Sequence, residues 1–236
     1  MNIDSASYSD IGSRAVNEDS LLLLECSGGF LAMVADGLGG YGNGDAASQC
    51  AVSVISETLS KQPPTEDTLS DAILLANQQV LAMQTDGKQM KTTIAALWLG
   101  DGEAVLATVG DTRIYQFRGG EIIFQTTDHS VSQLAVMVGL ISPDGIRGDK
   151  DRNKLTRALG AEQTVKVDTE ILQAEAGDSF LLCSDGFWEL ILEAQMCECL
   201  RQSDTAAQWL DAMRKIAAEA PNPKKDNNTA VVLTAR

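Results

Sequence analysis

Residues 30–48 read FLAMVADGLGGYGNGDAAS, in which an apolar run ends at an aspartate and a glycine-rich turn precedes a second apolar pattern. The run Phe30–Ala35 is too short for a helix and has strand character. From Asp45 to Leu59 the apolar residues fall on one face, which predicts an amphipathic helix. Asp36 and Gly37 therefore stand at the end of a strand, in the turn that leads toward a helix.

Two further segments have helical periodicity. The apolar residues of Thr68–Met83 fall on one helical face, and so do those of a segment from about Asp204 to Glu219. In the second segment Asp204 is suited to the N-cap position, and Pro221 and Pro223 block any extension of the helix.

Other short apolar runs have strand character. They are Ser20–Cys26, Thr92–Leu99, Ala104–Val109, Arg113–Arg118, Glu121–Gln125, Ser179–Ser184 and Thr229–Ala235. Gly119 and Gly120 join two of them as a hairpin turn, because glycine tolerates the positive φ that such a turn needs. The strands do not alternate regularly with helices, which predicts an α+β fold. We expect one layered domain over residues 1–236, with mixed helix and mobile loop in the less periodic stretch 126–160.

The composition limits the class of protein. The chain has 236 residues and a formal net charge of −15, which repels nucleic acid and anionic lipid, so neither is an expected partner. The first residues lack the basic start and apolar core of a leader, and the longest apolar runs are too short to cross a bilayer. Five cysteines at irregular spacing form no C-x-x-C pair, and we interpret them as reduced. These features indicate a cytoplasmic protein.

Four aspartates stand where a predicted strand ends or is about to begin: Asp36, Asp111, Asp185 and Asp226. If the strands are neighbours in one sheet system, their ends bring these carboxylates together. Like charges at short distance repel, and a hard divalent cation with oxygen ligands is the usual remedy. Asp-Gly is also a common turn dipeptide, so the metal-site interpretation depends on other segments as well.

Seven segments, in order along nearly the whole chain, resemble the PP2C family of metal-dependent protein serine/threonine phosphatases, also called PPM. They are SDIGSRAVNED (9–19), VADGLGGYGNGDAAS (34–48), TTIAAL (92–97), VGDTRIY (109–115), LTRALG (155–160), LLCSDGFWEL (181–190) and DNNTAVVL (226–233). The resemblance implies a four-layer α-β-β-α sandwich with two central antiparallel sheets flanked by helices. It also implies hydrolysis of phosphoserine and phosphothreonine in proteins by water activated between two divalent cations.

The resemblance also implies the metal ligands, residue by residue. Asp36 bridges the two cations, and the main-chain carbonyl of Gly37 binds one of them. Asp185 and Asp226 bind the other. Asp111, together with Asp185, corresponds to the site of a third, weaker cation in bacterial members. Aspartate and water suit Mn²⁺ or Mg²⁺ better than zinc, so we expect these ions as cofactors.

Three more residues have counterparts in the family's active site. Glu18 and Asp19 match acids that orient metal-bound waters. Arg14 matches the family's phosphate-binding arginine, whose planar guanidinium can contact two phosphate oxygens at once. A solvated surface arginine is the alternative interpretation, but the surrounding SRAVNED segment favours the functional role.

The chain departs from the family pattern at two positions. Leu38 stands where eukaryotic members carry a histidine that can protonate the leaving group, so a metal-bound water or another acid must supply that proton. Lys91 replaces the usual glycine before the paired threonines. His129, the only histidine, is expected to have a structural hydrogen-bonding role, since no carboxylate partner can be assigned from sequence.

Two other functions compete with this interpretation. Gly37, Gly39 and Gly42 spell the G-x-G-x-x-G pattern of a dinucleotide-binding oxidoreductase, although Asp36 would repel the pyrophosphate. The other is a catalytically inactive relative that binds phosphoproteins, although all the metal-site acids and Arg14 are present. The sequence signatures of cysteine phosphatases, histidine-rich dinuclear centres and P-loops are absent.

The small size resembles the compact bacterial members of the family, some of which accompany type VI secretion kinases. We therefore expect a monomeric phosphatase that reverses a eukaryotic-like serine/threonine kinase in a bacterium. The stretch 126–160 corresponds to the flap that the family places beside the active site, and we expect it to select substrates.

Overall fold

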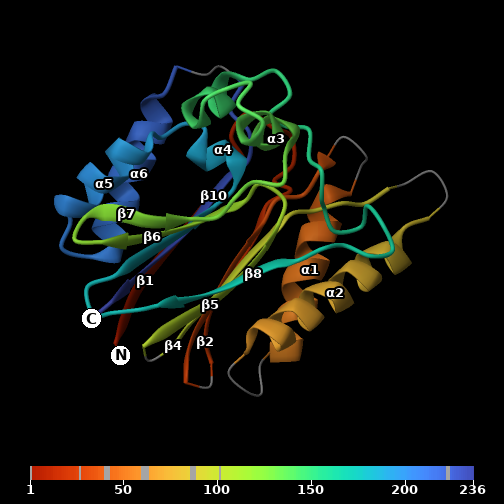
Figure 1. The fold of residues 1–236 in the computed structure, drawn as a ribbon, viewed down its shortest axis with the longest axis horizontal. Helices are drawn as coiled ribbons and strands as arrows, with labels where there is room; N and C mark the ends of the chain where they lie inside the picture. The colour runs from red at the N-terminus through yellow and green to blue at the C-terminus, as the bar shows by residue number, and fades with distance from the viewer. Residues whose placement is uncertain are drawn as a thin grey trace.

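The computed structural model describes residues 2–26, 28–39, 43–59, 64–85, 89–100, 102–221 and 224–236. Two five-stranded sheets lie face to face at its centre, with helices on both outer sides (Figure 1). All neighbouring strands in both sheets are antiparallel. The α+β sandwich expected from the sequence is confirmed.

The first sheet has the strand order β1-β10-β9-β6-β7. Its strands are β1 (Ile3–Asp10), β10 (Asn228–Ala235), β9 (Ser179–Cys183), β6 (Arg113–Arg118) and β7 (Glu121–Gln125). The first and last strands of the chain pair along their whole length, from Ile3 opposite Ala235 to Asp10 opposite Asn228. This pairing brings the residues that follow β1 close to those that precede β10.

The second sheet has the strand order β2-β3-β4-β5-β8. Its strands are β2 (Ser20–Cys26), β3 (Gly29–Ala35), β4 (Ile94–Gly100), β5 (Glu103–Val109) and β8 (Asp168–Gln173). In β3, Leu31 and Met33 pack toward the helices, whereas Ala32 and Val34 belong to the core that the two sheets share. Because both faces of β3 are buried, its sequence is a continuous apolar run rather than an alternating one.

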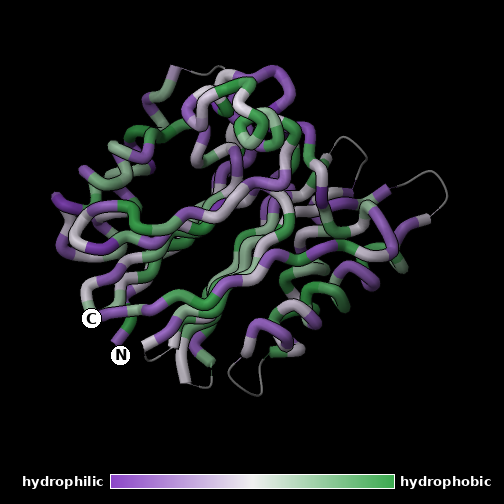
Figure 2. Tube along the Cα trace, viewed as in Figure 1, coloured by the Kyte–Doolittle hydropathy of each residue, from purple (hydrophilic) through white to green (hydrophobic). Residues whose placement is uncertain are grey.

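Helices cover the outer face of each sheet. The second sheet is covered by α1 (Gly44–Leu59) and α2 (Glu66–Met83), and the first by α5 (Glu193–Arg201) and α6 (Ala206–Glu219) (Figure 1). Trp209 of α6 packs edge-on against Phe117 of β6, with ring centroids 5.1 Å apart. Figure 2 shows hydrophobic residues concentrated along the central strands, as two buried sheets require.

Two sequence expectations concern turns and caps. Gly119 and Gly120 have φ values of 60° and 79° and connect β6 to β7, which confirms the predicted hairpin. The predicted N-cap at Asp204 is wrong. Thr205 caps α6 instead, because its hydroxyl accepts a hydrogen bond from the Gln208 N–H at 3.1 Å.

The edge strands β1 and β8 are missing from the sequence prediction. Residues 3–10 are rich in serine and aspartate, which have low strand propensity, and the strand is only partly buried. β8 is likewise mostly exposed or half-buried. Each of these strands pairs with a strongly apolar neighbour, β1 with β10 and β8 with β5, and this pairing stabilises it despite its weak strand signal.

The stretch 126–160 contains the short helix α3 (Val131–Met137) and the 3₁₀ helix η2 (Pro143–Gly148), consistent with the mixed helix expected there.

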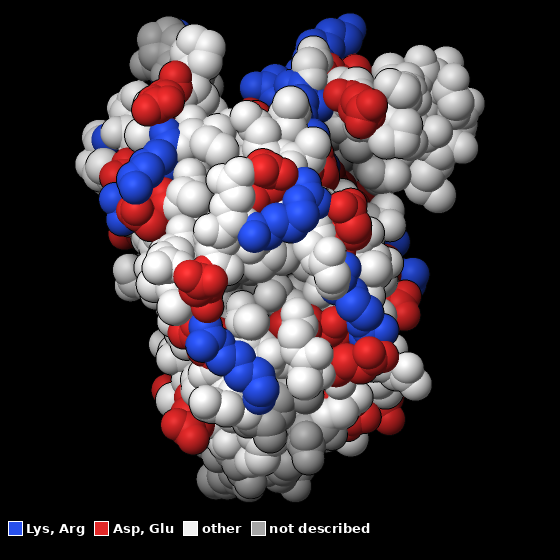
Figure 3. All heavy atoms as spheres, turned by 90° about the vertical axis from the view of Figure 1, so that its left-hand side faces the viewer, with Lys and Arg blue, Asp and Glu red and all other residues white. Residues whose placement is uncertain are grey.

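All five cysteines are free thiols. Within the described ranges, no helix combines the length and apolar character that crossing a bilayer requires. Figure 3 shows one face of the molecule, on which lysine and arginine side chains are interspersed with acidic ones rather than gathered into a basic patch.

Candidate active site

Asp36 leaves the end of β3 in a turn that two threonines hold. The Asp36 N–H donates to the hydroxyl of Thr93 at 2.9 Å, and the Asp36 carbonyl accepts from the Thr93 N–H at 2.8 Å. The Thr92 hydroxyl donates to the same carbonyl at 2.9 Å. The paired threonines of the TTIAAL segment therefore fix the main chain at Asp36.

Glu18 packs against the glycine-rich turn that follows Asp36. Its carboxylate accepts a hydrogen bond from the Gly44 N–H at 3.2 Å. A Cβ atom at Gly39 would lie 1.7 Å from a Glu18 carboxylate oxygen, and one at Gly37 would lie 2.6 Å from the Glu18 carbonyl oxygen. These two glycines therefore permit close approach to Glu18, a sufficient reason for their presence without a dinucleotide. Gly42, the third glycine of that pattern, lies outside the described residues.

Asp185 and Asp226 come from neighbouring strands of the other sheet. Asp185 begins the short helix α4 (Asp185–Trp188) just after β9, and Asp226 precedes β10. Gly186 allows the two segments to meet, because a Cβ there would lie 2.0 Å from the Asn227 carbonyl oxygen. The sequence expectation that strand ends carry these acids is met in both sheets.

A pocket of about 580 Å³ opens where these strand ends meet. Six of the eight predicted site residues line it: Arg14, Glu18, Asp36, Gly37, Asp185 and Asp226. Residues 153–158, Ala161 and Glu162 also contribute to its lining. Asp19 and Asp111 do not line the pocket. Asp111 is buried, and one Asp19 carboxylate oxygen, Oδ1, is buried without a hydrogen-bond partner among the described residues.

Burial and mutual repulsion raise the pKa values of the acids. Burial, followed by repulsion from Asp185, raises the pKa of Asp36 well above its ordinary value. Burial is also the largest cause for Asp185, whose pKa rises to about 7, and for Asp19, whose pKa rises to about 6. For Asp111, burial and then Asp185 raise the pKa. Several buried carboxylates that repel one another form a place where a cation binds favourably.

The donor set suits a hard, hydrated cation. No three His, Cys, Asp or Glu side chains in the described part of the chain form a ready-made cage for an ion. Mg²⁺ keeps several of its waters and binds proteins through one or two carboxylates, so a complete cage is not needed. The Asp19 Oδ1, which has no hydrogen-bond partner among the described residues, is an acceptor that an ordered water would satisfy. The residues present therefore fit divalent cations with mixed carboxylate and water ligands.

Arg14 reaches the pocket because the two chain ends pair. Gly12 has a φ of 61°, and a Cβ there would lie 2.2 Å from the Asp226 carbonyl oxygen, so only glycine allows this crossing. The Ser13 N–H donates to the Lys225 carbonyl at 2.8 Å. The Arg14 guanidinium then forms an ion pair with the Asp226 carboxylate while its side chain stays 58% exposed. A cation in this position can meet a phosphate that enters the pocket.

Asn227 is a site residue that sequence reasoning did not single out. Its side-chain oxygen accepts from the Glu18 N–H at 2.9 Å, and its amide donates to the carbonyls of Ile11 and Val16 at 2.9 and 3.0 Å. It thus holds the loop that carries Arg14 and Glu18. The available signal was its place directly after Asp226 in DNNTAVVL, but an asparagine in a loop gives no indication of its distant partners.

His129 is held on both ring nitrogens. The Gly110 N–H donates to Nδ1 at 3.0 Å, so the proton lies on Nε2, which is 3.0 Å from the Asp168 carboxylate. Burial lowers the pKa of His129, which keeps the ring neutral. The expected structural role is supported by this geometry. Its carboxylate partner could not be found from sequence because Asp168 lies on the unpredicted strand β8.

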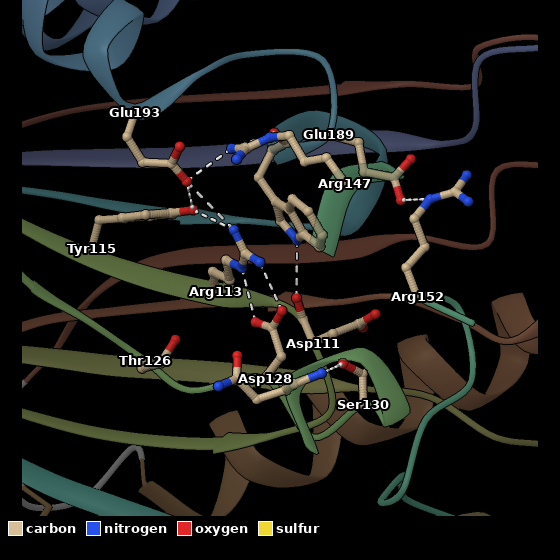
Figure 4. A network of polar contacts seen from close by, with 12 residues as sticks. Asp111, Arg113, Tyr115, Thr126, Asp128, Ser130, Arg147, Arg152, Glu189 and Glu193 are labelled. Carbon is tan, nitrogen blue, oxygen red and sulfur yellow. Dashed lines mark hydrogen bonds and ion pairs between the residues drawn. The ribbon is translucent and has the colours of Figure 1, made fainter. Parts of the chain in front are cut away.

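A buried polar network lies next to Asp111 (Figure 4). Arg113 binds Asp128 through two hydrogen bonds of 2.8 and 2.7 Å, with both side chains almost fully buried. The guanidinium also lies over the Trp188 ring, 3.5 Å from its centroid. Asp128 belongs to the stretch 126–160, so the network joins the start of the expected flap to the segment that carries Asp111.

Two further arginines attach the stretch 126–160 to the first sheet's helical layer. Arg147 of η2 contacts Glu193 at 2.8 Å and donates to the Trp188 carbonyl at 3.1 Å (Figure 4). Arg152 contacts Glu189 at 2.6 Å. These contacts place residues 153–158 in the pocket lining beside the predicted metal ligands.

Comparison with known proteins identifies the family of the chain. The family model for protein phosphatase 2C matches residues 6–226. The serine/threonine phosphatase Stp of Listeria innocua is 31% identical over 215 residues, which cover 87% of this chain and 84% of that protein.

Solved structures share the whole fold. The Mycobacterium tuberculosis serine/threonine phosphatase PstP/Ppp has a TM-score of 0.88 and 30% identity, with 99% of both chains covered. The catalytic domain of PstP in complex with two manganese ions has a TM-score of 0.84 and 29% identity, covering 98% of this chain and 97% of that one. A dinucleotide-binding oxidoreductase is not favoured by these findings. The chain belongs to the PP2C family of metal-dependent protein serine/threonine phosphatases.

Proposed function

We propose that this chain hydrolyses phosphoserine and phosphothreonine in proteins at the pocket where β3, β9 and β10 meet. The observation that carries the proposal is the presence of Asp36, from one sheet, in the same pocket as Asp185 and Asp226, from the other, with Arg14 beside them. Membership of the PP2C family supports the same reaction.

The proposed cofactors are two Mn²⁺ or Mg²⁺ ions. Asp36 would bridge them, with the Gly37 carbonyl on one ion and Asp185 and Asp226 on the other. Asp111, with Asp185, would hold a third, weaker ion. When bound, such cations lower the pKa of the attacking water and offset the negative charge that develops on the phosphoryl oxygens. The PstP complex with two manganese ions supports this number.

The remaining site residues would bind the substrate phosphate and orient water. Arg14 would grip the substrate phosphate, because its exposed guanidinium can exchange the Asp226 carboxylate for two phosphate oxygens. Glu18 and Asp19 would orient ordered water, and the Asp19 Oδ1, an acceptor that no group in the described part of the chain satisfies, suits that role. Leu38 has no proton to give, and both His129 ring nitrogens are engaged, so neither is the general acid.

The physiological setting is also proposed. The substrates would be proteins phosphorylated by a eukaryotic-like bacterial kinase, and the chain would act as a monomer in the cytoplasm. Five free thiols suit a reducing compartment. The shared pocket of the two sheets supports one catalytic domain over residues 1–236. The flap, residues 126–160, would select substrates, since residues 153–158 line the pocket.

The test is phosphate release from a phosphothreonine peptide by the purified chain, measured with Mn²⁺ and with EDTA. Asp185→Asn and Asp226→Asn should abolish release, whereas Asp211→Asn, a change on α6 outside the pocket, should not. Undiminished release in EDTA or in Asp185→Asn would overturn the proposal. Peptide binding without release of phosphate, even from p-nitrophenyl phosphate at saturating Mn²⁺, would establish the inactive binding protein instead.

A further inference from the structure

Asp168 is the first residue of β8, and its carboxylate contacts both ends of the flap, residues 126–160. One oxygen lies 3.0 Å from Nε2 of His129, near the beginning of the flap, and the other lies 2.7 Å from Arg157, near its end. We propose that Asp168 is a positioning residue that fastens the two ends of the flap to the second sheet and thereby strengthens the binding of protein substrates. The proposal rests on the phosphatase function above and deepens the role assigned there to the flap.

Both of these partners present a donor to Asp168. His129 carries its proton on Nε2, because the Gly110 N–H donates to Nδ1, and the Arg157 guanidinium has donors only. His129 Nε2 and Arg157 Nη1 are 3.1 Å apart, a distance that is unfavourable for two donors without a shared acceptor. A carboxylate supplies one acceptor oxygen to each donor. An amide at position 168 would supply one acceptor and one further donor, so it could satisfy only one of the two partners.

Asp168 is ionised at neutral pH. Partial burial alone would raise its pKa, but hydrogen bonds from His129, Lys166 and Arg157 outweigh that effect and lower the pKa to about 2. Lys166 is 72% exposed and contacts the carboxylate at 3.1 Å, so solvent screens its contribution more than that of the buried His129. The contacts with His129 and Arg157 therefore provide most of the attachment.

The two ends of the flap also lie side by side through their main chains. The Val131 N–H donates to the Lys154 carbonyl, and the Thr156 N–H donates to the His129 carbonyl, each at 2.8 Å. Two paired segments with few hydrogen bonds are only marginally stable by themselves. A side-chain contact that holds both segments at once therefore adds to the order of the flap.

Asp168 attaches the flap to a different layer of the molecule from the other side chains described above. Arg147 and Arg152 bind it to the helical layer of the first sheet. β8 is an edge strand of the second sheet, in which β3 ends just before Asp36. Arg157 lines the pocket, whereas Asp168 does not. Asp168 therefore acts on a substrate only through the flap residues that it holds.

The test compares a phosphothreonine peptide, which is long enough to contact the flap, with p-nitrophenyl phosphate, which is not. Asp168→Asn should raise the KM for the peptide by about two- to tenfold at nearly unchanged kcat, because binding must then order the flap. The constants for p-nitrophenyl phosphate should stay near those of the wild type. Loss of a negative charge near the pocket would by itself lower the KM for an anionic peptide, so the direction of the change separates positioning from charge.

Two further variants serve as controls. Glu170→Gln removes the same charge from an exposed position of the same strand, outside the pocket lining, and should not raise the KM. Asp168→Glu keeps two acceptor oxygens and should lie closer to the wild type than Asp168→Asn does. Hydrogen–deuterium exchange gives a readout independent of activity. The segment 129–156 should exchange faster in Asp168→Asn, whereas the central strands β4 and β9 should exchange as in the wild type.

An unchanged KM for the peptide in Asp168→Asn, or an equal rise in Glu170→Gln, would overturn the proposal. An equal loss with p-nitrophenyl phosphate, or faster exchange throughout the chain, would also overturn it, since Asp168 would then support the fold in general. If the wild type hydrolyses neither substrate, the phosphatase function fails, and the exchange of segment 129–156 still decides whether Asp168 holds the flap.

Discussion

The indole N–H of Trp188 donates a hydrogen bond to the main-chain carbonyl of Asp111 at 3.0 Å. Trp188 ends α4, the helix that Asp185 begins. One buried side chain therefore ties the turn that carries Asp111 to the helix that carries Asp185. These are the two acids proposed to share the third cation, so their relative position depends on a residue that contacts neither substrate nor metal.

Trp188→Phe should weaken that third site. The smaller ring leaves the Asp111 carbonyl without its donor and opens a small cavity, at a combined cost of about 2–4 kcal/mol in unfolding free energy. We expect the Mn²⁺ concentration for half-maximal phosphate release to rise. Urea unfolding in EDTA measures the first effect, and Mn²⁺ titration of activity measures the second.

Trp209→Phe is the matched control for this change. The Trp209 N–H also donates to a buried main-chain carbonyl, that of Met196 at 3.1 Å, but it lies between α5 and α6 away from the pocket. It should lose similar stability without altering the Mn²⁺ dependence. If the Mn²⁺ concentration for half-maximal release rose equally in both variants, the cause would be the general loss of stability and not the contact with Asp111.

His129→Gln should keep most of the activity. Glutamine can accept from the Gly110 N–H and donate toward Asp168, so the turn before Asp111 stays supported. The pH profile of kcat/KM should have the same shape as that of the wild type, since the histidine is buried and neutral. Loss of one limb of the profile in His129→Gln would show that His129 takes part in proton transfer.

The central strands and their acids were predictable because their signals are local. A strand buried on both faces, such as β3, must be apolar throughout, and the aspartate that ends it is then conspicuous. Asp36 and Asp185 could be located in this way without knowledge of the fold. Their meeting in one pocket followed from the resemblance, because strand order depends on contacts between distant segments.

Most of the unpredicted features depend on contacts that the local sequence does not show. β1 has little strand propensity of its own and is formed against β10 at the other end of the chain. Asn227 is a loop residue by its local sequence, and its three partners lie more than 200 positions away. The Arg113–Asp128 pair joins two segments whose burial the sequence does not reveal. Propensity and periodicity carry no information about such pairings.

Arg14→Ala should mainly impair substrate binding. Loss of a charge-assisted contact to phosphate corresponds to about 1.5–3 kcal/mol, or roughly 10- to 150-fold in kcat/KM, expressed largely as a higher KM. Arg201→Ala, which removes an exposed arginine of α5 paired with Glu121 and Glu198, should leave both constants near the wild-type values. An Arg14→Ala variant with normal KM and reduced kcat would move Arg14 from phosphate binding to transition-state stabilisation.

The buried acids should make the metal-free protein less stable as pH rises. The pKa of Asp185 is raised from 3.8 to about 7 and that of Asp19 from 3.8 to about 6, so the folded chain holds protons that the unfolded chain has released. The unfolding free energy should therefore fall between about pH 4 and pH 7, by a few kcal/mol, because each pKa unit corresponds to about 1.4 kcal/mol. Urea unfolding in EDTA at pH 5 and pH 8 measures the change.

Asp185→Asn separates this effect from the general repulsion of an acidic chain. The amide cannot ionise, so the variant should lose less stability than the wild type between pH 5 and pH 8, and should be the more stable of the two at pH 8 in EDTA. Mn²⁺ at pH 8 should raise the stability of the wild type by binding only its folded form, and should raise that of Asp185→Asn much less. If the two proteins lose equal unfolding free energy between pH 5 and pH 8 and respond equally to Mn²⁺, the pH effect comes from other groups. Asp185 would then not be a metal ligand.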